Sequence, residues 1–138
     1  MALSAAREVA RFVDQQIRSF PIAAAVKIWK GGLVAISAAG FAKIPAASVA
    51  DVCAGVAHET ADNTAGAAGA VFAKVQTLGD VVLPFAAAAQ TDLGVPIYCT
   101  DDSVLTLTST NNVYVGLIVG VTVGVDVTVR LDSFRTAP

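Results

Sequence analysis

Charged residues are scarce in this chain of 138 residues. Asp, Glu, Lys and Arg make up 14% of it and apolar types 55%, whereas about 25% of an average soluble domain is charged. Large uncovered apolar surfaces mark interfaces, so this composition predicts that another chain covers part of the surface. The net charge of -2 argues against a general nucleic-acid binder, because clustered Lys and Arg hold the phosphate backbone.

Cysteine and histidine are also rare. Cys53 and Cys99 form no CxxC motif, and His58 is the single histidine, which argues against both a disulfide framework and a zinc site. His58, Glu59 and Asp62 form the one cluster of metal-ligating residue types. Adjacent residues on a strand point to opposite faces, so a strand end that leads into a solvated loop is the favoured interpretation.

Motifs for nucleotide or nucleophilic chemistry are missing as well. The chain contains neither GxSxG nor GxxxxGK[ST], and no GxGxxG joins a strand to a helix. Asp101 and Asp102 are neighbours that turn chemistry explains better than acid and base catalysis does. We therefore expect a protein that is not an enzyme and that needs no cofactor or metal. A small hydrolase that uses His58 remains the rival hypothesis.

A long uniform apolar run is lacking too. Glu8, Arg11 and Asp14 interrupt any signal-peptide core, which predicts a protein made in the cytoplasm. In "VYVGLIVGVTVGVDVTVRL", residues 113–131, three glycines lie four apart, as in packed membrane helices. From residue 120 to residue 131, however, apolar residues occupy every odd position, and the run before Asp126 is too short for a membrane helix.

This stretch therefore predicts a closing β-hairpin, about 113–120 and 125–132, and no membrane partner. The hairpin is expected to turn near residues 121–124. Gly120 and Gly124 are the expected places for a bend or bulge, and Gly116 the expected place where a neighbouring backbone comes close.

The N-terminal part has a different pattern. In "LSAAREVARFVDQQIRSF", residues 3–20, apolar side chains recur every three or four positions, which predicts an amphipathic helix capped by Ser4 that ends before Pro21. Six of the nine Lys and Arg residues lie at or before Lys43, and nine of the eleven Asp and Glu residues follow it. This division suggests a basic N-terminal segment on an acidic surface of a neighbour. We divide the chain into an N-terminal helix or arm, 1–22, and one β domain, 23–138.

After Pro21, short runs rich in β-branched and aromatic residues alternate with turn residues about every ten positions. This rhythm is typical of a mainly β sandwich or small barrel. Besides the closing hairpin we expect strands at 25–30, 33–37, 41–44, 52–58, 70–76, 79–84, 96–99 and 103–108. Residues 59–69 are small and polar, and are expected to form a mobile or partner-ordered loop. Trp29, Phe41, Phe72 and Phe85 are expected in the core, with an interface as the other possibility for each of them.

Several short sequence segments occur in an order that resembles a known protein family. The chain runs through "AAAVKIWKGGLVAISAAGFAKIP", "AGVAHETADNTAGAAG", "VVLPFAAAAQTDLGVPIYCTDDSVLTLTSTNN", "VGLIVG" and "VTVRL". This order resembles the small phage capsid decoration, or cement, proteins of the DUF2190 group, over about four fifths of the chain. The matching residues are turn and strand positions, such as Lys30 to Val34 and Gly94 to Asp101, and they carry over no catalytic role. Many members of the group begin directly with an extended segment, so the expected N-terminal helix departs from their pattern.

The resemblance implies a β-barrel or β-tulip-like unit on the outside of a virion capsid, present as a homotrimer that holds major capsid proteins together. Individually weak contacts suffice in a trimer because avidity adds them. The resemblance and the basic amphipathic segment together suggest a candidate interface with the capsid or with a neighbouring protomer: Arg7, Arg11, Phe12, Val13, Ile17, Arg18, Phe20 and Trp29. The alternative function is a β-barrel binding module that recognises host-surface carbohydrate, for which one Trp and two Tyr are few aromatics.

Overall fold

The computed structural model describes residues 17–46 and 50–138. It is mainly β, with 47% strand and 3% helix. In chain order the elements are β1 (Ile17–Pro21), β2 (Val26–Ile28), β3 (Leu33–Ile36), β4 (Ala42–Lys43), β5 (Val52–Ala57), β6 (Ala61–Asn63), β7 (Phe72–Gln76), β8 (Asp80–Pro84), the 3-10 helix η1 (Gln90–Asp92), β9 (Pro96–Cys99), β10 (Leu105–Thr106), β11 (Val113–Thr122) and β12 (Asp126–Leu131).

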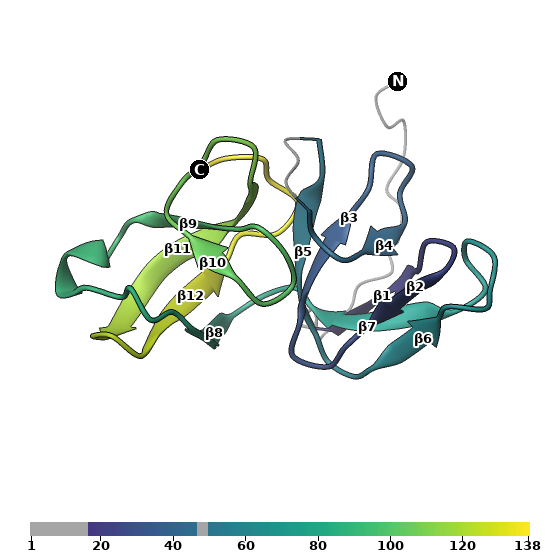
Figure 1. The fold of residues 1–138 in the computed structure, drawn as a ribbon, viewed down its shortest axis with the longest axis horizontal. Helices are drawn as coiled ribbons and strands as arrows, with labels where there is room; N and C mark the ends of the chain where they lie inside the picture. The colour runs from purple at the N-terminus through teal and green to yellow at the C-terminus, as the bar shows by residue number, and fades with distance from the viewer. Residues whose placement is uncertain (1–16, 47–49) are drawn as a thin grey trace, which may run out of the picture.

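The strands form three antiparallel sheets, none of which is closed. One has the order β1-β7-β5-β3-β4, the second β10-β9-β11-β12-β8, and the third pairs β2 with β6. Figure 1 shows the second sheet on one side of the molecule and the other two on the opposite side. Strand β5 of the first sheet lies near the middle of the view, next to the second sheet. Of the two expected architectures, these open sheets match a small sandwich and not a closed barrel. No helix in residues 17–46 and 50–138 has the length and hydropathy needed to cross a membrane.

Two apolar clusters lie on opposite faces of the sheet that contains β3 and β5. Leu33 and Cys53 join a cluster with Ile97, Val115 and other residues of the second sheet. Val34 and Ala54, the next residue on each strand, join Ile28 and other residues in the second cluster. This follows from the alternation of side chains along a strand. Full burial of a Val or Leu side chain is worth about 1.5–3 kcal/mol, so both faces of these strands contribute to stability.

Strands occur at all eight positions that the sequence predicts between residues 25 and 108, with the same bounds at 96–99 and shorter bounds elsewhere. The closing hairpin is also confirmed, although its turn lies at residues 123–125, slightly later than expected. Gly124 has φ of +70° in that turn. The register of β11 against β12 shifts between Ile118 and Gly120, as at a bulge.

The predicted N-terminal helix is wrong where it can be compared. Residues 1–16 lie outside the described part of the chain, but residues 17–20 belong to β1, which pairs antiparallel with β7 from Ile17↔Gln76 to Pro21↔Phe72. The residue before a proline is biased away from the helical region, and pairing with β7 provides the backbone of β1 with hydrogen-bond partners. The three- and four-residue spacing of apolar side chains therefore does not decide the structure here.

The expected loop at 59–69 is also partly wrong, because it contains β6 and a buried asparagine. Asn63 is 1% exposed. Its side-chain Nδ2 donates to the carbonyl oxygens of Ala23 and Ala67, at 3.0 Å each, and of Ile22 at 3.4 Å. The buried amide ties this segment to the chain that follows β1, so the segment has fixed contacts within the chain itself.

Candidate functional site

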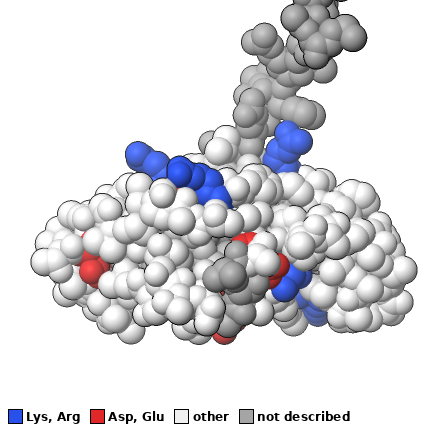
Figure 2. All heavy atoms as spheres, turned by 90° about the horizontal axis from the view of Figure 1, so that it is seen from above, with Lys and Arg blue, Asp and Glu red and all other residues white. Residues whose placement is uncertain are grey.

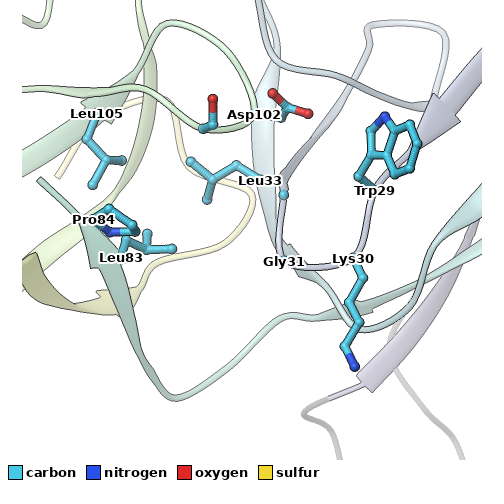
Figure 3. Close-up of a pocket in the computed structure, with 10 residues that line it drawn as sticks. Trp29, Lys30, Gly31, Leu33, Leu83, Pro84, Asp102 and Leu105 are labelled. Atoms are coloured by element: carbon cyan, nitrogen blue, oxygen red, sulfur yellow. The ribbon is translucent and has the colours of Figure 1, made fainter.

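An apolar hollow lies where the two large sheets approach each other, and we call it the Trp29 groove. Its volume is about 400 Å³, within the roughly 300–1,000 Å³ that is typical of ligand sites. The β2–β3 turn, the β9–β10 turn and strands β3, β8 and β10 contribute its lining (Figure 3): Trp29, Lys30, Gly31, Gly32, Leu33, Leu83, Pro84, Asp102, Ser103 and Leu105.

Backbone hydrogen bonds fix the turn that forms one wall of the groove. The Gly32 N–H donates to the Trp29 carbonyl at 3.0 Å, and the Leu33 N–H to the Asp102 carbonyl at 2.9 Å. The Lys30 N–H donates to Thr60 Oγ1 at 3.0 Å. A Cβ on Gly32 would lie 3.1 Å from the Trp29 carbonyl oxygen and 3.5 Å from Asp102. Glycine therefore lets the turn lie against the β9–β10 turn, and the wall is formed without a ligand.

Asp101 and Asp102 have different roles, as the turn interpretation predicts. Asp101 Oδ1 accepts hydrogen bonds from the backbone N–H groups of Ser103 and Val104, both at 2.8 Å. These hydrogen bonds lower the pKa of Asp101, because they favour its charged form. Asp102 lines the groove instead. The two carboxylates therefore do not form a catalytic pair, and Asp102 contributes a negative group at the mouth of an apolar groove.

Trp29 is 55% exposed, so the expectation that it lies in the core is wrong. Its ring is covered on one side by a cation, because Lys27 Nζ lies 3.9 Å from the ring centroid. The same nitrogen is 3.9 Å from Asp62 Oδ2. Phe72 is 56% exposed and is likewise not a core residue. Exposed aromatic rings of this kind are typical of binding surfaces.

A second hollow of about 390 Å³ lies between β1 and the C-terminal residues; Arg18, Phe20, Leu78 and Phe134 are among its lining residues. The rings of Phe20 and Phe134 meet edge to face, with centroids 5.7 Å apart. The carboxylate of Asp132, which also lines it, accepts from the Tyr114 hydroxyl at 3.0 Å and pairs with Arg135 at 3.2 Å. This hollow is therefore mixed in character, with aromatic and ionic groups side by side.

The structure divides the residues of the predicted interface. Arg7, Arg11, Phe12 and Val13 lie outside the described residues. Arg18 and Phe20 line the second hollow and Trp29 lines the groove, and the two hollows share no lining residue. Ile17, at the start of β1, is exposed. Of the described members of the predicted set, two therefore line the second hollow and one lines the Trp29 groove.

The groups with reactive side chains do not converge. Within 17–46 and 50–138, no three His, Cys, Asp or Glu side chains gather as they would around a metal ion. His58 is exposed just after β5. Cys53 and Cys99 are buried free thiols. Burial raises the pKa of Cys53 to about 12 and also raises that of Cys99, so both thiols stay protonated near neutral pH, and the thiolate is the reactive form.

Sequence reasoning missed the groove residues Leu83, Pro84 and Leu105. Their strands were predicted, but β8 and β10 are opposite edges of one sheet, and no local pattern shows that both line the same hollow. Asp102 was noticed, but only as part of a turn. Comparisons with protein-family models, with curated proteins and with solved structures each found no match.

Proposed function

We propose that the protein is a non-enzymatic structural component of a phage head, a decoration protein that binds the outside of the capsid as a homotrimer and stabilises contacts between major capsid proteins. The observation that supports it best is the number of large apolar side chains left exposed. They occur on both sides of the molecule, and include Ile17, Trp29, Phe72, Val82, Val119, Val123 and Phe134. A subunit covered on more than one side would bury them.

The charged groups support the same proposal. Figure 2 shows one face of the molecule on which the charged residues occupy small groups, one of them with both signs side by side, amid a mostly uncharged surface. Several of the charges are paired within the chain: Lys43 with Asp51 at 2.7 Å and Arg130 with Asp80 at 3.1 Å. The order of phrases along the sequence adds the resemblance to capsid decoration proteins. The subunit surface thus fits an apolar, neutral partner such as another copy or a capsid protein.

Sedimentation of the protein alone and mixed with undecorated shells tests this proposal. We expect a trimer in solution and co-sedimentation with the shells. Ile17→Lys should weaken one or both, because it places a charge on an exposed apolar position of the proposed interface. Ile17→Val is the matched control, since it keeps an apolar side chain at the same exposed position. A protein that stays monomeric and does not sediment with the shells would contradict the proposal.

One observation favours the alternative function, recognition of host carbohydrate. Trp29 is an exposed ring beside the carboxylate of Asp102 and the hydroxyl of Ser103 in a preformed groove, and sugars bind through such a combination of a flat apolar ring and polar groups. A glycan array probed with the protein tests it. Binding that is lost in Trp29→Ala and retained in His58→Ala would favour this function over the capsid role.

A further inference from the structure

The Trp29 groove lies beside two free strand edges. Among residues 17–46 and 50–138, strands β8 and β10 of the sheet β10-β9-β11-β12-β8 each have a neighbour on one side only. Leu83 and Pro84 of β8 and Leu105 of β10 all line the groove, and Figure 3 shows the side chains of Leu83 and Pro84 beside that of Leu105. The sheet therefore curls so that its two edges approach the same hollow without closing.

The pairing of β8 with β12 shows which backbone groups face the free edge. Phe85 N–H donates to the Val125 carbonyl, and Leu131 N–H to the Gly79 carbonyl, at 3.0 Å each. In an antiparallel pair such bonds fall on alternate residues, so the odd-numbered residues of β8 bond to β12. The N–H and C=O of Val82 consequently point away from β12, toward the side where the sheet has no further strand.

The side chains between the two ends of β8 leave the middle of this edge open as well. Natural edge strands avoid unwanted pairing with charges, prolines or bulges. In β8, Asp80 and Pro84 stand at the two ends, and the residues between them are Val, Val and Leu. Val82 is 63% exposed, whereas Leu83 is 8% exposed. A strand added beside β8 would place alternate side chains in the groove, next to Leu83, and the others next to Val82.

The charges at the groove indicate the polarity of an occupant. Asp102 lines the mouth, whereas the side chain of Lys30 extends away from Leu33, Leu83 and Leu105 in Figure 3. The neighbouring Asp101 is engaged in its own turn. Lys27 covers one side of the Trp29 ring, which leaves less of that ring for a sugar to stack on. An apolar chain with a basic residue matches these surroundings better than a sugar does.

We propose that the free edge of β8 and the Trp29 groove bind an extended segment of another protein by strand addition. The segment pairs its backbone with Val82, places alternate apolar side chains against Leu83, Leu33 and Leu105, and brings a Lys or Arg to Asp102. Strand addition gains affinity from main-chain hydrogen bonds and specificity from pockets for alternate side chains. This binding site goes beyond the capsid role, and it does not depend on which shell, if any, the protein decorates.

The test selects from a library of random heptapeptides on the full-length protein and then uses a synthetic peptide of the enriched sequence. Trp29 is the single tryptophan, so its fluorescence reports occupancy of the groove. Val82→Pro removes the N–H that faces the free edge. It breaks no hydrogen bond to β12, since that N–H points away from β12, and proline is tolerated at such edge positions. We expect the affinity to fall at least about tenfold, the equivalent of about 1.4 kcal/mol, in Val82→Pro. It should change little in Val82→Thr, which keeps both the N–H and the branched side chain.

A second measurement leaves the protein unchanged, so that a folding defect in a variant cannot mislead. The peptide is N-methylated at the amides that pair with β8, or, as the matched control, at the alternate amides. Binding should be lost with the first peptide and kept with the second. Asp102→Asn should weaken peptides that contain Lys or Arg more than peptides that lack them.

Three results would overturn the proposal: no enriched peptide, equal binding to wild type and Val82→Pro, or equal binding of both N-methylated peptides. Glycan binding at the groove that survives Val82→Pro would assign the site to carbohydrate instead. Trp29 and Val82 are also among the exposed apolar residues that support the capsid proposal, so shell binding is measured separately by co-sedimentation. The capsid proposal can then fail while this one stands, and the reverse.

Discussion

Asn63 shows how one polar side chain organises a segment whose composition predicts a loop. Its amide donates to three carbonyl oxygens, those of Ile22, Ala23 and Ala67, and so joins residues 41 positions apart in sequence. The small and polar residues of the segment 59–69 predict a mobile or partner-ordered loop. Sequence reasoning could not show that Asn63 is buried against the chain that follows β1, because burial of a polar group depends on partners that are distant in sequence.

Replacing Asn63 with Ala is expected to destabilise the fold by about 1–3 kcal/mol, since buried carbonyl groups would lose their donor. Urea unfolding followed by circular dichroism measures the free energy of unfolding. Thr64→Ala is the matched control on the same segment, because Thr64 is exposed and bonds only locally, to Asp62; we expect a loss below about 0.5 kcal/mol there. Equal losses in both variants would show that the amide has no special role.

At the scale of elements, the glycines of the closing hairpin have a structural reason that differs from position to position. A Cβ on Gly116 would overlap the carbonyl oxygen of Arg130, whereas one on Gly124 would meet nothing within 4 Å. Gly116 therefore permits the close approach of β12 that the sequence predicts, and Gly124 serves the turn through its positive φ. The spacing of four that resembles a membrane-helix motif is a coincidence of these separate requirements.

Gly116→Ala is expected to cost about 2 kcal/mol or more in unfolding free energy, because strand β12 must move or the local hydrogen bonds must break. Gly120→Ala is the matched control on the same strand: a Cβ there would lie 3.1 Å from the side chain of Thr128, which has more freedom to adjust than a backbone. Chemical denaturation of the two variants beside the wild type measures the difference. A Gly116→Ala variant that is as stable as Gly120→Ala would contradict the account of close approach.

The elements themselves were largely predictable, and their arrangement was not. Alternation of Val with polar residues predicts β12, and turn residues such as Gly79 delimit β7 and β8. Strand β1 was missed because its apolar residues also fit helical spacing, and pairing with β7 decides between the two. The Trp29 groove was missed because it depends on tertiary structure. Leu83 and Leu105 belong to the two edge strands at opposite ends of one sheet, and only the curvature of that sheet brings them to the same hollow.

At the scale of the whole molecule, β1 determines which N-terminal deletion can test the proposed docking role without disturbing the fold. It is the edge strand of its sheet, and the described chain begins with its first residue, Ile17. A deletion of residues 1–20 would remove most of β1, including Phe20, whose ring contacts Phe134. A deletion that ends at residue 16 leaves every described strand in place and is therefore the cleaner test of the proposed docking role.

We expect the protein that lacks residues 1–16 to keep its β fold, as followed by circular dichroism, because every described strand keeps its pairing partner. A deletion of residues 1–21 should instead lose several kcal/mol of unfolding free energy, since it uncovers the edge of β7 and removes the side chain of Phe20. In co-sedimentation, the shorter deletion should bind shells much more weakly than the full chain, as Arg7, Arg11, Phe12 and Val13 are gone. If it decorates shells equally well, the N-terminal segment has no docking role, and the contact must lie on the exposed apolar surfaces of the β fold.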